Sequence, residues 1–359
     1  MYRSSHWSVC LVAAFVVGYL VLLGDLAHPP QAVDLDEPLA HSRRRAMLEL
    51  GRQLFFDARL SADGTVSCAT CHRPEQAFAD GRTVAEGVYG RQGTRNTPSL
   101  RHTASTQAKF WDGRRPSLET QVLDPFVNPQ EHGLPDHAAL IHKLQKSTDY
   151  DSLWRDALDL PLAQADLTVL SQALSTYILS LQPANTRLDR YLFHRETTAL
   201  RPEAQRGLAL FLGRAQCAAC HHISATEAAL ADGAYHSLGL GFTRLVPELP
   251  KLLTILKTTP REAIDRLIAT DAQLAALGRF VVTGHATDIG KFKTPSLRNV
   301  ADTAPYMHDG SVATLEEAVE RELYYRGRVR GRPLGLSLAD RSDLLAFLRA
   351  LSDAPAELP

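Results

Sequence analysis

Two short runs of the sequence share a pattern of two cysteines followed by a histidine. They are Cys68-Ala69-Thr70-Cys71-His72 and Cys217-Ala218-Ala219-Cys220-His221. In a C-x-x-C-H run both thiols add across the vinyl groups of a haem, and the histidine becomes an iron ligand. The pattern therefore predicts two covalently attached c-type haems, with four thioether bonds (Cys68, Cys71, Cys217, Cys220) and two histidine ligands (His72, His221).

A single C-x-x-C pair would also suit a redox dithiol or half of a zinc site. The adjacent histidine in both copies argues against these alternatives. The fifth cysteine, Cys10, stands alone, so no structural disulfide is expected.

The elements that position these motifs fit a two-domain chain. A length of 359 residues suggests roughly two domains, each with its own core. We expect an N-terminal haem domain over residues 41–195 and a C-terminal one over 196–359. Lys and Arg (39) balance Asp and Glu (40), so neither nucleic acid nor an anionic membrane surface is indicated as a partner.

Residues 1–40 are expected to direct export. Residues 9–24 are apolar and uncharged after Arg3, which is typical of a secretory signal and short for a spanning helix. Since c-type haem is normally attached outside the cytoplasm, a periplasmic location follows. A cleaved signal and a retained membrane anchor remain alternatives.

Apolar spacing predicts helices before each haem motif. The first covers residues 42–56 with Ser42 as N-cap, and the second covers 203–212. This weak repeat suggests duplication of a cytochrome c-like unit. Further helices are expected over residues 138–144, 166–181 and 339–351.

Beyond the haem motifs, the chain resembles the bacterial dihaem cytochrome c peroxidase family, which includes MauG-type enzymes. The resemblance extends from about residue 48 to 351 and is carried by residues 50–57, 77–81, 95–99, 110–114 (F-W-D-G-R), 128–131, 292–300 and 303–310. It implies a mostly α fold of two cytochrome c-like domains, each with one haem.

The resemblance also implies catalytic residues. In the family the tryptophan of F-W-D-G-R, here Trp111, relays electrons between the haems. Residues at the spacings of Gln121 and Glu131 line the peroxide-binding side of the first haem. O–O cleavage needs a group that moves a proton between the peroxide oxygens, and a carboxylate in an apolar pocket has a raised pKa suited to this. Outside their motifs, Glu131 would be interpreted as a solvated loop residue and Trp111 as a core residue.

Some family members place a histidine on the distal side of the first haem, between the first haem motif and F-W-D-G-R. Residues 73–101 contain no histidine, and His102 comes too late in the motif. We therefore predict a five-coordinate first haem that is open without reductive activation. His132 and His137 are expected in a polar loop.

Two further sites follow from the resemblance. An asparagine side chain and two backbone carbonyls hold a calcium ion in the family, and these positions correspond to Asn96, Thr303 and Pro305; neutral oxygens suit calcium. For the sixth ligand of the second haem, electron-accepting members use methionine. Residues 314–327 contain none.

MauG-type members use tyrosine at that place, in a Tyr-x-Arg-Gly context that Tyr324 shares. Counted from His308, Tyr324 falls about two residues later than the family's tyrosine ligand. Tyr325, or no protein ligand, remains an alternative, and either tyrosine would otherwise be interpreted as an amphipathic residue at a domain edge.

The leading prediction is a peroxidase that reduces hydrogen peroxide at the first haem. Electrons would come from a small periplasmic donor (a cytochrome c or cupredoxin) through the second haem. One alternative is a MauG-like enzyme that oxidises a side chain of a protein substrate, with the oxidising equivalents shared by both haems. Another, from a different class, is a non-enzymatic electron-transfer cytochrome, which would need neither Gln121 nor Glu131.

Overall fold

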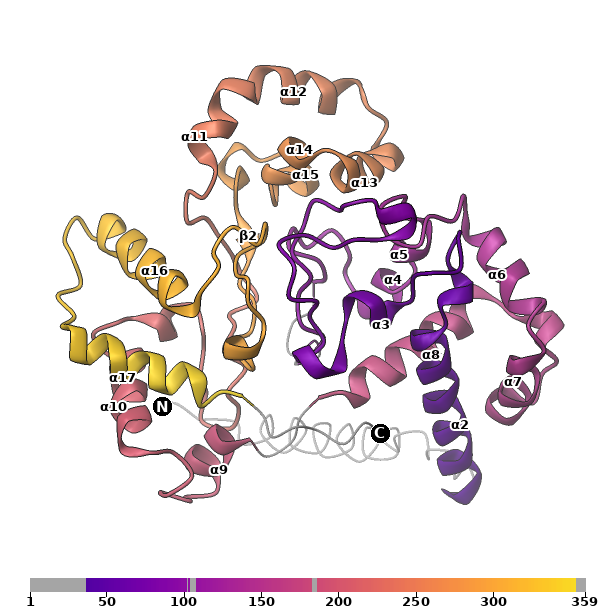
Figure 1. Ribbon diagram of the computed structural model, residues 1–359, viewed down its shortest axis with the longest axis horizontal. Coiled ribbons are helices and arrows are strands. Elements are labelled where there is room, and N and C mark those ends of the chain that lie inside the picture. Colours follow the sequence, from indigo (N-terminus) through magenta and orange to yellow (C-terminus); the bar gives the residue numbers. More distant parts are fainter. Residues whose placement is uncertain (1–36, 102, 104–107, 183–185, 353–359) are drawn as a thin grey trace, which may run out of the picture. The chain divides into compact units, whose positions relative to one another are not determined.

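The computed structural model of the chain is mostly helical (Figure 1). It describes residues 37–101, 103, 108–182 and 186–352. The chain divides into two compact units between Arg44 and Arg45, and all sites considered below lie in the second unit. Within the described residues no helix combines the length and apolar character needed to cross a membrane. The apolar segment 9–24 and His102 lie outside the described residues.

A first hydrophobic core lies around the first haem motif. It contains residues of α2 (Glu37–Phe56), α4 (Leu118–Gln121), α5 (Asp124–Val127), α6 (His137–Gln145), α7 (Asp151–Leu158) and α8 (Leu167–Ser180). Helix α8 begins where the Asp166 carboxylate accepts a hydrogen bond from the Val169 amide, as an N-cap does. Helix α2 approaches α8 at Gly51, where a Cβ atom would lie 2.0 Å from the Ala173 carbonyl oxygen. Only glycine permits this approach.

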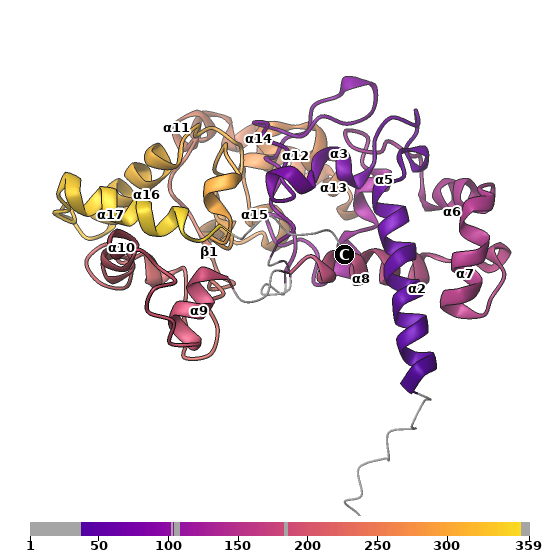
Figure 2. The ribbon, with the colours of Figure 1, turned by 60° about the horizontal axis from the view of Figure 1, so that its bottom comes forward.

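A second core repeats this arrangement around the second haem motif. It contains residues of α9 (Arg187–Phe193), α10 (Pro202–Leu212), α16 (Leu315–Val329) and α17 (Leu338–Arg349). Helices α10 and α17 lie side by side (Figure 2). At Gly207 a Cβ atom would lie 2.0 Å from the Asp343 carbonyl oxygen, as at Gly51. Each glycine precedes a fully buried phenylalanine, Phe55 or Phe211, by four residues. The internal repeat expected from the sequence is therefore present in the packing.

A third, smaller core was not predicted from the haem motifs. It contains residues of α11 (Phe242–Leu245), α12 (Leu249–Thr258), α13 (Arg261–Thr270), α14 (Ala272–Ala276) and α15 (Phe280–Thr283), which are grouped together in Figure 1. Thr94 donates a hydrogen bond of 2.8 Å to the Ile268 carbonyl, and Arg115 forms a 2.5 Å ion pair with Asp265. These contacts join the third core to the segment between the first haem motif and α4.

Other elements confirm or correct the expected boundaries. Helices α6, α8, α10 and α17 agree with the predicted ones within two residues. The first helix begins at Glu37, so Ser42 lies inside α2 and is not its N-cap. A two-stranded antiparallel sheet pairs β1 (Tyr235–His236) with β2 (Phe292–Lys293).

A buried ion pair holds the 292–300 segment to α9. Arg298 donates hydrogen bonds of 2.9 Å and 2.5 Å to the two carboxylate oxygens of Asp189, and the two side chains are 6% and 15% exposed. Asp189 also completes the capping box of α9 with Thr186. Burial opposes ionisation, yet the bonds from Arg298 and Thr186 outweigh it and lower the pKa of Asp189.

We expect Asp189→Asn to lower the free energy of unfolding by about 3 kcal/mol, because it leaves the Arg298 charge buried without its partner. The pKa of Asp189 is lower in the folded protein than in the unfolded chain. The stabilisation from ionised Asp189 is therefore fully present above its pKa in the unfolded chain, and it is lost as the pH falls through its pKa in the folded protein. Denaturant unfolding at neutral pH measures the loss. Asp343→Asn removes the exposed pair with Arg206 as a control and should change stability far less; equal effects would contradict the expectation.

Candidate active site

The first haem motif places its histidine in a fixed orientation. Cys68–Cys71 forms helix α3, whose start is closed by a capping box between Ser67 and Thr70. The Nδ1 atom of His72 lies 2.9 Å from the carbonyl oxygen of Phe78. Since Nδ1 donates to that carbonyl, Nε2 carries the lone pair that can bind a metal. Burial lowers the pKa of His72, which favours the neutral, ligating form.

The second motif repeats this geometry. His221 follows the short helix η7 (Cys217–Ala219), and its Nδ1 atom lies 2.8 Å from the carbonyl oxygen of Leu230. Burial lowers the pKa of His221 to about 4. Both imidazoles are thus oriented by a backbone carbonyl a few residues along the chain.

The cysteine thiols are in surroundings unlike those of a redox dithiol. Burial raises the pKa of Cys68 and Cys71 to about 12 and that of Cys217 to about 11. A reactive dithiol or a zinc site needs thiolates, which arise from lowered pKa values. The environment therefore disfavours both alternatives to haem attachment.

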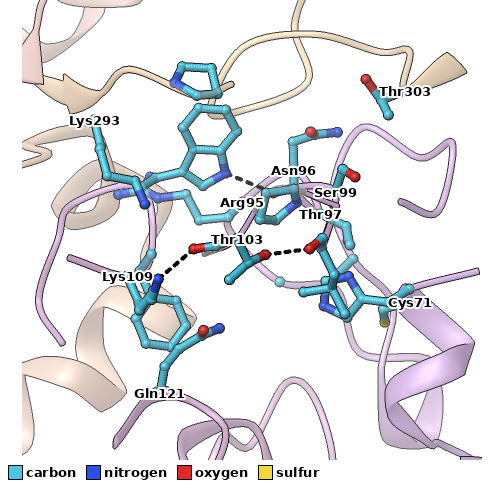
Figure 3. A pocket seen from close by; sticks show the side chains of 18 of the residues that line it. Cys71, Arg95, Asn96, Thr97, Ser99, Thr103, Lys109, Gln121, Lys293 and Thr303 are labelled. Carbon is cyan, nitrogen blue, oxygen red and sulfur yellow. Dashed lines mark hydrogen bonds between the residues drawn. The ribbon is translucent and has the colours of Figure 1, made fainter. Parts of the chain in front are cut away.

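A cavity of about 270 Å³ extends from the first haem motif (Figure 3). It is lined by all the predicted catalytic and calcium-binding residues, which are Asn96, Trp111, Gln121, Glu131, Thr303 and Pro305. These residues are separated by up to about two hundred positions in the chain. In Figure 3, Gln121 lies beside Lys109, while Asn96 and Thr303 lie on the other side of the view.

Glu131 is held in a tight turn after α5. The Asn128 side chain accepts a hydrogen bond from the Gln130 amide and donates one of 2.6 Å to a Glu131 carboxylate oxygen. Burial raises the pKa of Glu131, and the charge of Arg114 and the Asn128 bond oppose this rise. The result is a positioned carboxyl group that takes up a proton more readily than a solvated glutamate.

Trp111 connects this cavity to the C-terminal half of the chain. Its indole Nε1 donates a 3.0 Å hydrogen bond to the Asn96 carbonyl, and its own carbonyl accepts one of 2.8 Å from the Lys293 amide. The Asn96 amide in turn donates to the His308 carbonyl at 3.0 Å. The indole is therefore fixed between segments from both halves.

Asn96, the side chain predicted to bind calcium, lines the cavity. Its Nδ2 atom donates a 2.9 Å hydrogen bond to the Arg82 carbonyl, which leaves Oδ1 as an acceptor. Thr303 and Pro305 line the same cavity. The oxygen donors that these three residues offer are neutral, a kind that suits calcium.

Six basic residues that were not predicted as site residues also line the cavity: Arg95, Arg101, Lys109, Arg114, Lys293 and Arg298. Burial lowers the pKa of Arg95 to about 10 and, together with the charge of Lys109, that of Lys293 to about 8; burial also lowers the pKa of Lys109. The charge of the buried Asp112 carboxylate opposes the lowering at Arg95 and Lys293 only in part, since the pKa of each stays below its ordinary value.

Two histidines lie differently from the polar loop that was expected. His132 is 3% exposed, its ring centroid lies 4.7 Å from that of Phe126, and burial lowers its pKa to about 4. The turn that exposes Glu131 to the cavity directs the next side chain into the first core. His137 begins α6, with Nε2 3.1 Å from the Leu123 carbonyl oxygen.

Tyr324 lies on the outer face of α16. The residue is 58% exposed, and its hydroxyl accepts a hydrogen bond of 3.3 Å from Arg328. Tyr325 is partly buried, with its ring edge 3.3 Å from where a Cβ of Gly239 would lie.

The chain is similar to known proteins over most of its length. A family profile described as di-haem cytochrome c peroxidase matches residues 45–197. A cytochrome-c peroxidase, IdrP2, of Pseudomonas sp. (strain SCT) is 33% identical, over 89% of this chain and 84% of the relative. The methylamine utilization protein MauG of Methylorubrum extorquens is 32% identical, over 89% of this chain and 82% of the relative.

The chain belongs to the di-haem cytochrome c peroxidase family. A crystal structure of a MauG-like protein associated with microbial copper homeostasis has a TM-score of 0.67 and 32% identity, covering 90% of this chain and 93% of that one. The diheme peroxidase BthA from Burkholderia thailandensis has a TM-score of 0.65 and 25% identity, covering 86% of each chain. These likenesses confirm the mostly α fold.

The residues present fit the two c-type haems that membership of the di-haem cytochrome c peroxidase family implies. Each motif offers two thiols and one oriented imidazole, and the cavity next to His72 contains buried cations. Haem propionates are anions that would offset the charges of Arg95, Lys109 and Lys293. Sequence reasoning missed these cations because it assigned no role to Arg95 and Lys293, although both stand in segments that carry the family resemblance.

Proposed function

We propose that this protein is an exported dihaem peroxidase that reduces hydrogen peroxide in the cavity beside His72. The observation that carries the proposal is that Gln121, Glu131 and Trp111 line one cavity together with the first haem motif. The test is the rate at which the holoprotein consumes peroxide with a reduced small c-type cytochrome as electron donor. A rate no higher than that of free haem would reject the proposal.

The haems held at Cys68–His72 and Cys217–His221 would supply peroxide activation and electron storage, respectively. Glu131 would accept a proton from one oxygen of hydrogen peroxide and return it to the other oxygen, which leaves as water. Its raised pKa suits both steps, since the carboxylate accepts the proton and the acid then gives it up. Asn128 holds the carboxylate in place, and Gln121 orients peroxide by hydrogen bonding.

Trp111 carries electrons towards the cavity from the C-terminal half. The indole donates a hydrogen bond to the Asn96 carbonyl, and the Trp111 carbonyl accepts one from the Lys293 amide. These two bonds keep the indole in one orientation, which suits a residue that transfers one electron after another. The external donor we propose is a small periplasmic cytochrome c or cupredoxin.

We propose calcium binding by Asn96 Oδ1 and the carbonyls of Thr303 and Pro305, completed by water. We expect metal analysis of the desalted wild-type protein to find roughly one calcium per chain and Asn96→Ala to abolish it. Asn96→Asp keeps an oxygen donor and should retain the ion. Equal calcium in wild type and Asn96→Ala would contradict the assignment.

MauG-like oxidation of a protein side chain is the second candidate. It is favoured by the absence of methionine among residues 314–327 and by relatives named MauG. EPR of the diferric protein before and after one equivalent of peroxide separates the two. Loss of both ferric signals without an equivalent radical supports the MauG-like role. Persistence of the second haem's signal beside a protein radical supports peroxide removal.

A further inference from the structure

The buried face of α16 is defined by the residues that pack into the second core. Leu315, Ala318, Val319 and Leu323 are all less than 10% exposed. A helix advances roughly 100° per residue, so Glu322 lies within this apolar face and Tyr324 lies roughly opposite its centre. Their exposure agrees with this placement, since Glu322 is partly buried and Tyr324 is exposed.

Glu322 is directed towards the second haem motif. Its carboxylate Oε2 lies 3.5 Å from Nε of Arg326, one turn further along α16. Arg326 donates a 2.8 Å hydrogen bond to the carbonyl of Gln216, the residue before Cys217. Burial is the main cause of the raised pKa of Cys217 and of Cys220, and the negative charge of Glu322 adds to the rise in both.

The surroundings of Glu322 are unusual for a structural carboxylate. Burial raises its pKa, and the Arg326 and His236 charges offset this only in part. His236 itself is paired with Asp232 at 2.7 Å. A carboxylate kept in a partly desolvated position at a haem motif costs stability, which a metal ligand bond would offset.

We infer that Glu322 occupies the place in the second haem site where the family has its tyrosine, so that a carboxylate oxygen of α16 is the sixth ligand of that iron. Counted from His308, the family's tyrosine position lies about two residues before Tyr324, which is Glu322. The inference rests on the proposed function in that it needs a haem attached at Cys217 and Cys220. An anionic oxygen ligand favours ferric iron, so the second haem should have a lower potential than one ligated by methionine.

The test compares Glu322→Gln with Tyr324→Phe in the diferric holoprotein, after haem content shows two haems per chain. We expect Glu322→Gln to change the EPR signal of the second haem and Tyr324→Phe to leave it as in wild type. A changed signal in Tyr324→Phe, or an unchanged one in Glu322→Gln, would overturn the assignment.

Glu322→Met provides a second, independent measurement. It should introduce methionine ligation and raise the midpoint potential of the second haem, with the first haem's potential unchanged. An unaltered potential would overturn the inference, even if Glu322→Gln proved unstable. These readouts do not depend on turnover: a wild-type protein that holds both haems and fails to consume peroxide would refute the proposed function and leave the ligand assignment standing.

Discussion

Glu131→Gln should reduce peroxide turnover by about 10²–10⁴-fold, the range that a positioned general acid–base group contributes. Glutamine is nearly isosteric, so the bond to Asn128 can be kept while proton transfer is lost. The optical spectrum of both haems should stay nearly unchanged. Stopped-flow kinetics of peroxide reaction with the diferric protein measures the loss.

The pH dependence gives a second readout of the same group. The catalytic carboxylate must be ionised to accept the first proton, so kcat/KM should fall as the pH drops through its pKa. Because burial raises that pKa above its ordinary value of 4.5, the acid limb should lie above 4.5 and disappear in Glu131→Gln. Glu75→Gln removes an exposed carboxylate of the same half as a control. Wild-type turnover in Glu131→Gln would remove the acid–base assignment.

Trp111→Phe should slow donor-supported turnover by about tenfold or more, equivalent to ~1.4 kcal/mol in the barrier of the limiting step. Phenylalanine fills most of the ring volume, yet it lacks the N–H group that bonds to the Asn96 carbonyl and is much harder to oxidise. The initial reaction of peroxide with the diferric protein should keep its rate, since Glu131 and Gln121 are untouched. Steady-state and single-turnover measurements on one preparation separate the two effects.

A matched control for this variant is Trp154→Phe. Trp154 is fully buried in α7 within the first core and is not among the residues lining the cavity. Its replacement should lower stability through lost packing and leave turnover per folded molecule unchanged. If Trp154→Phe slowed turnover as much as Trp111→Phe, the relay role would be untenable.

Local features of the site were predictable from the sequence. The imidazoles of His72 and His221 are oriented by carbonyls only six and nine residues further on, so the motif and its neighbourhood suffice. The turn that holds Glu131 is also local, because Asn128 makes its contacts within three residues. Such features follow from short-range hydrogen bonding.

Features that depend on tertiary packing were not predictable. Arg95 and Lys293 are separated by nearly two hundred residues, and the resemblance, which does bring Asn96 together with Thr303 and Pro305, gives no role to these two charged side chains. The side chains of α16 show another limit, since a shift of two residues turns a position by roughly 200° about the helix axis. A motif-based assignment of Tyr324 could therefore not distinguish the outer face from the one that holds Glu322.

Carbon monoxide binding to the fully reduced protein tests the central claim most directly. An iron with an open position binds carbon monoxide, whereas an iron saturated by two protein ligands resists it. We predict one carbon monoxide per two haems in an optical titration, bound at the haem attached to Cys68 and Cys71. If neither haem bound carbon monoxide, both irons would be saturated, and the protein would then be an electron-transfer cytochrome rather than a peroxidase.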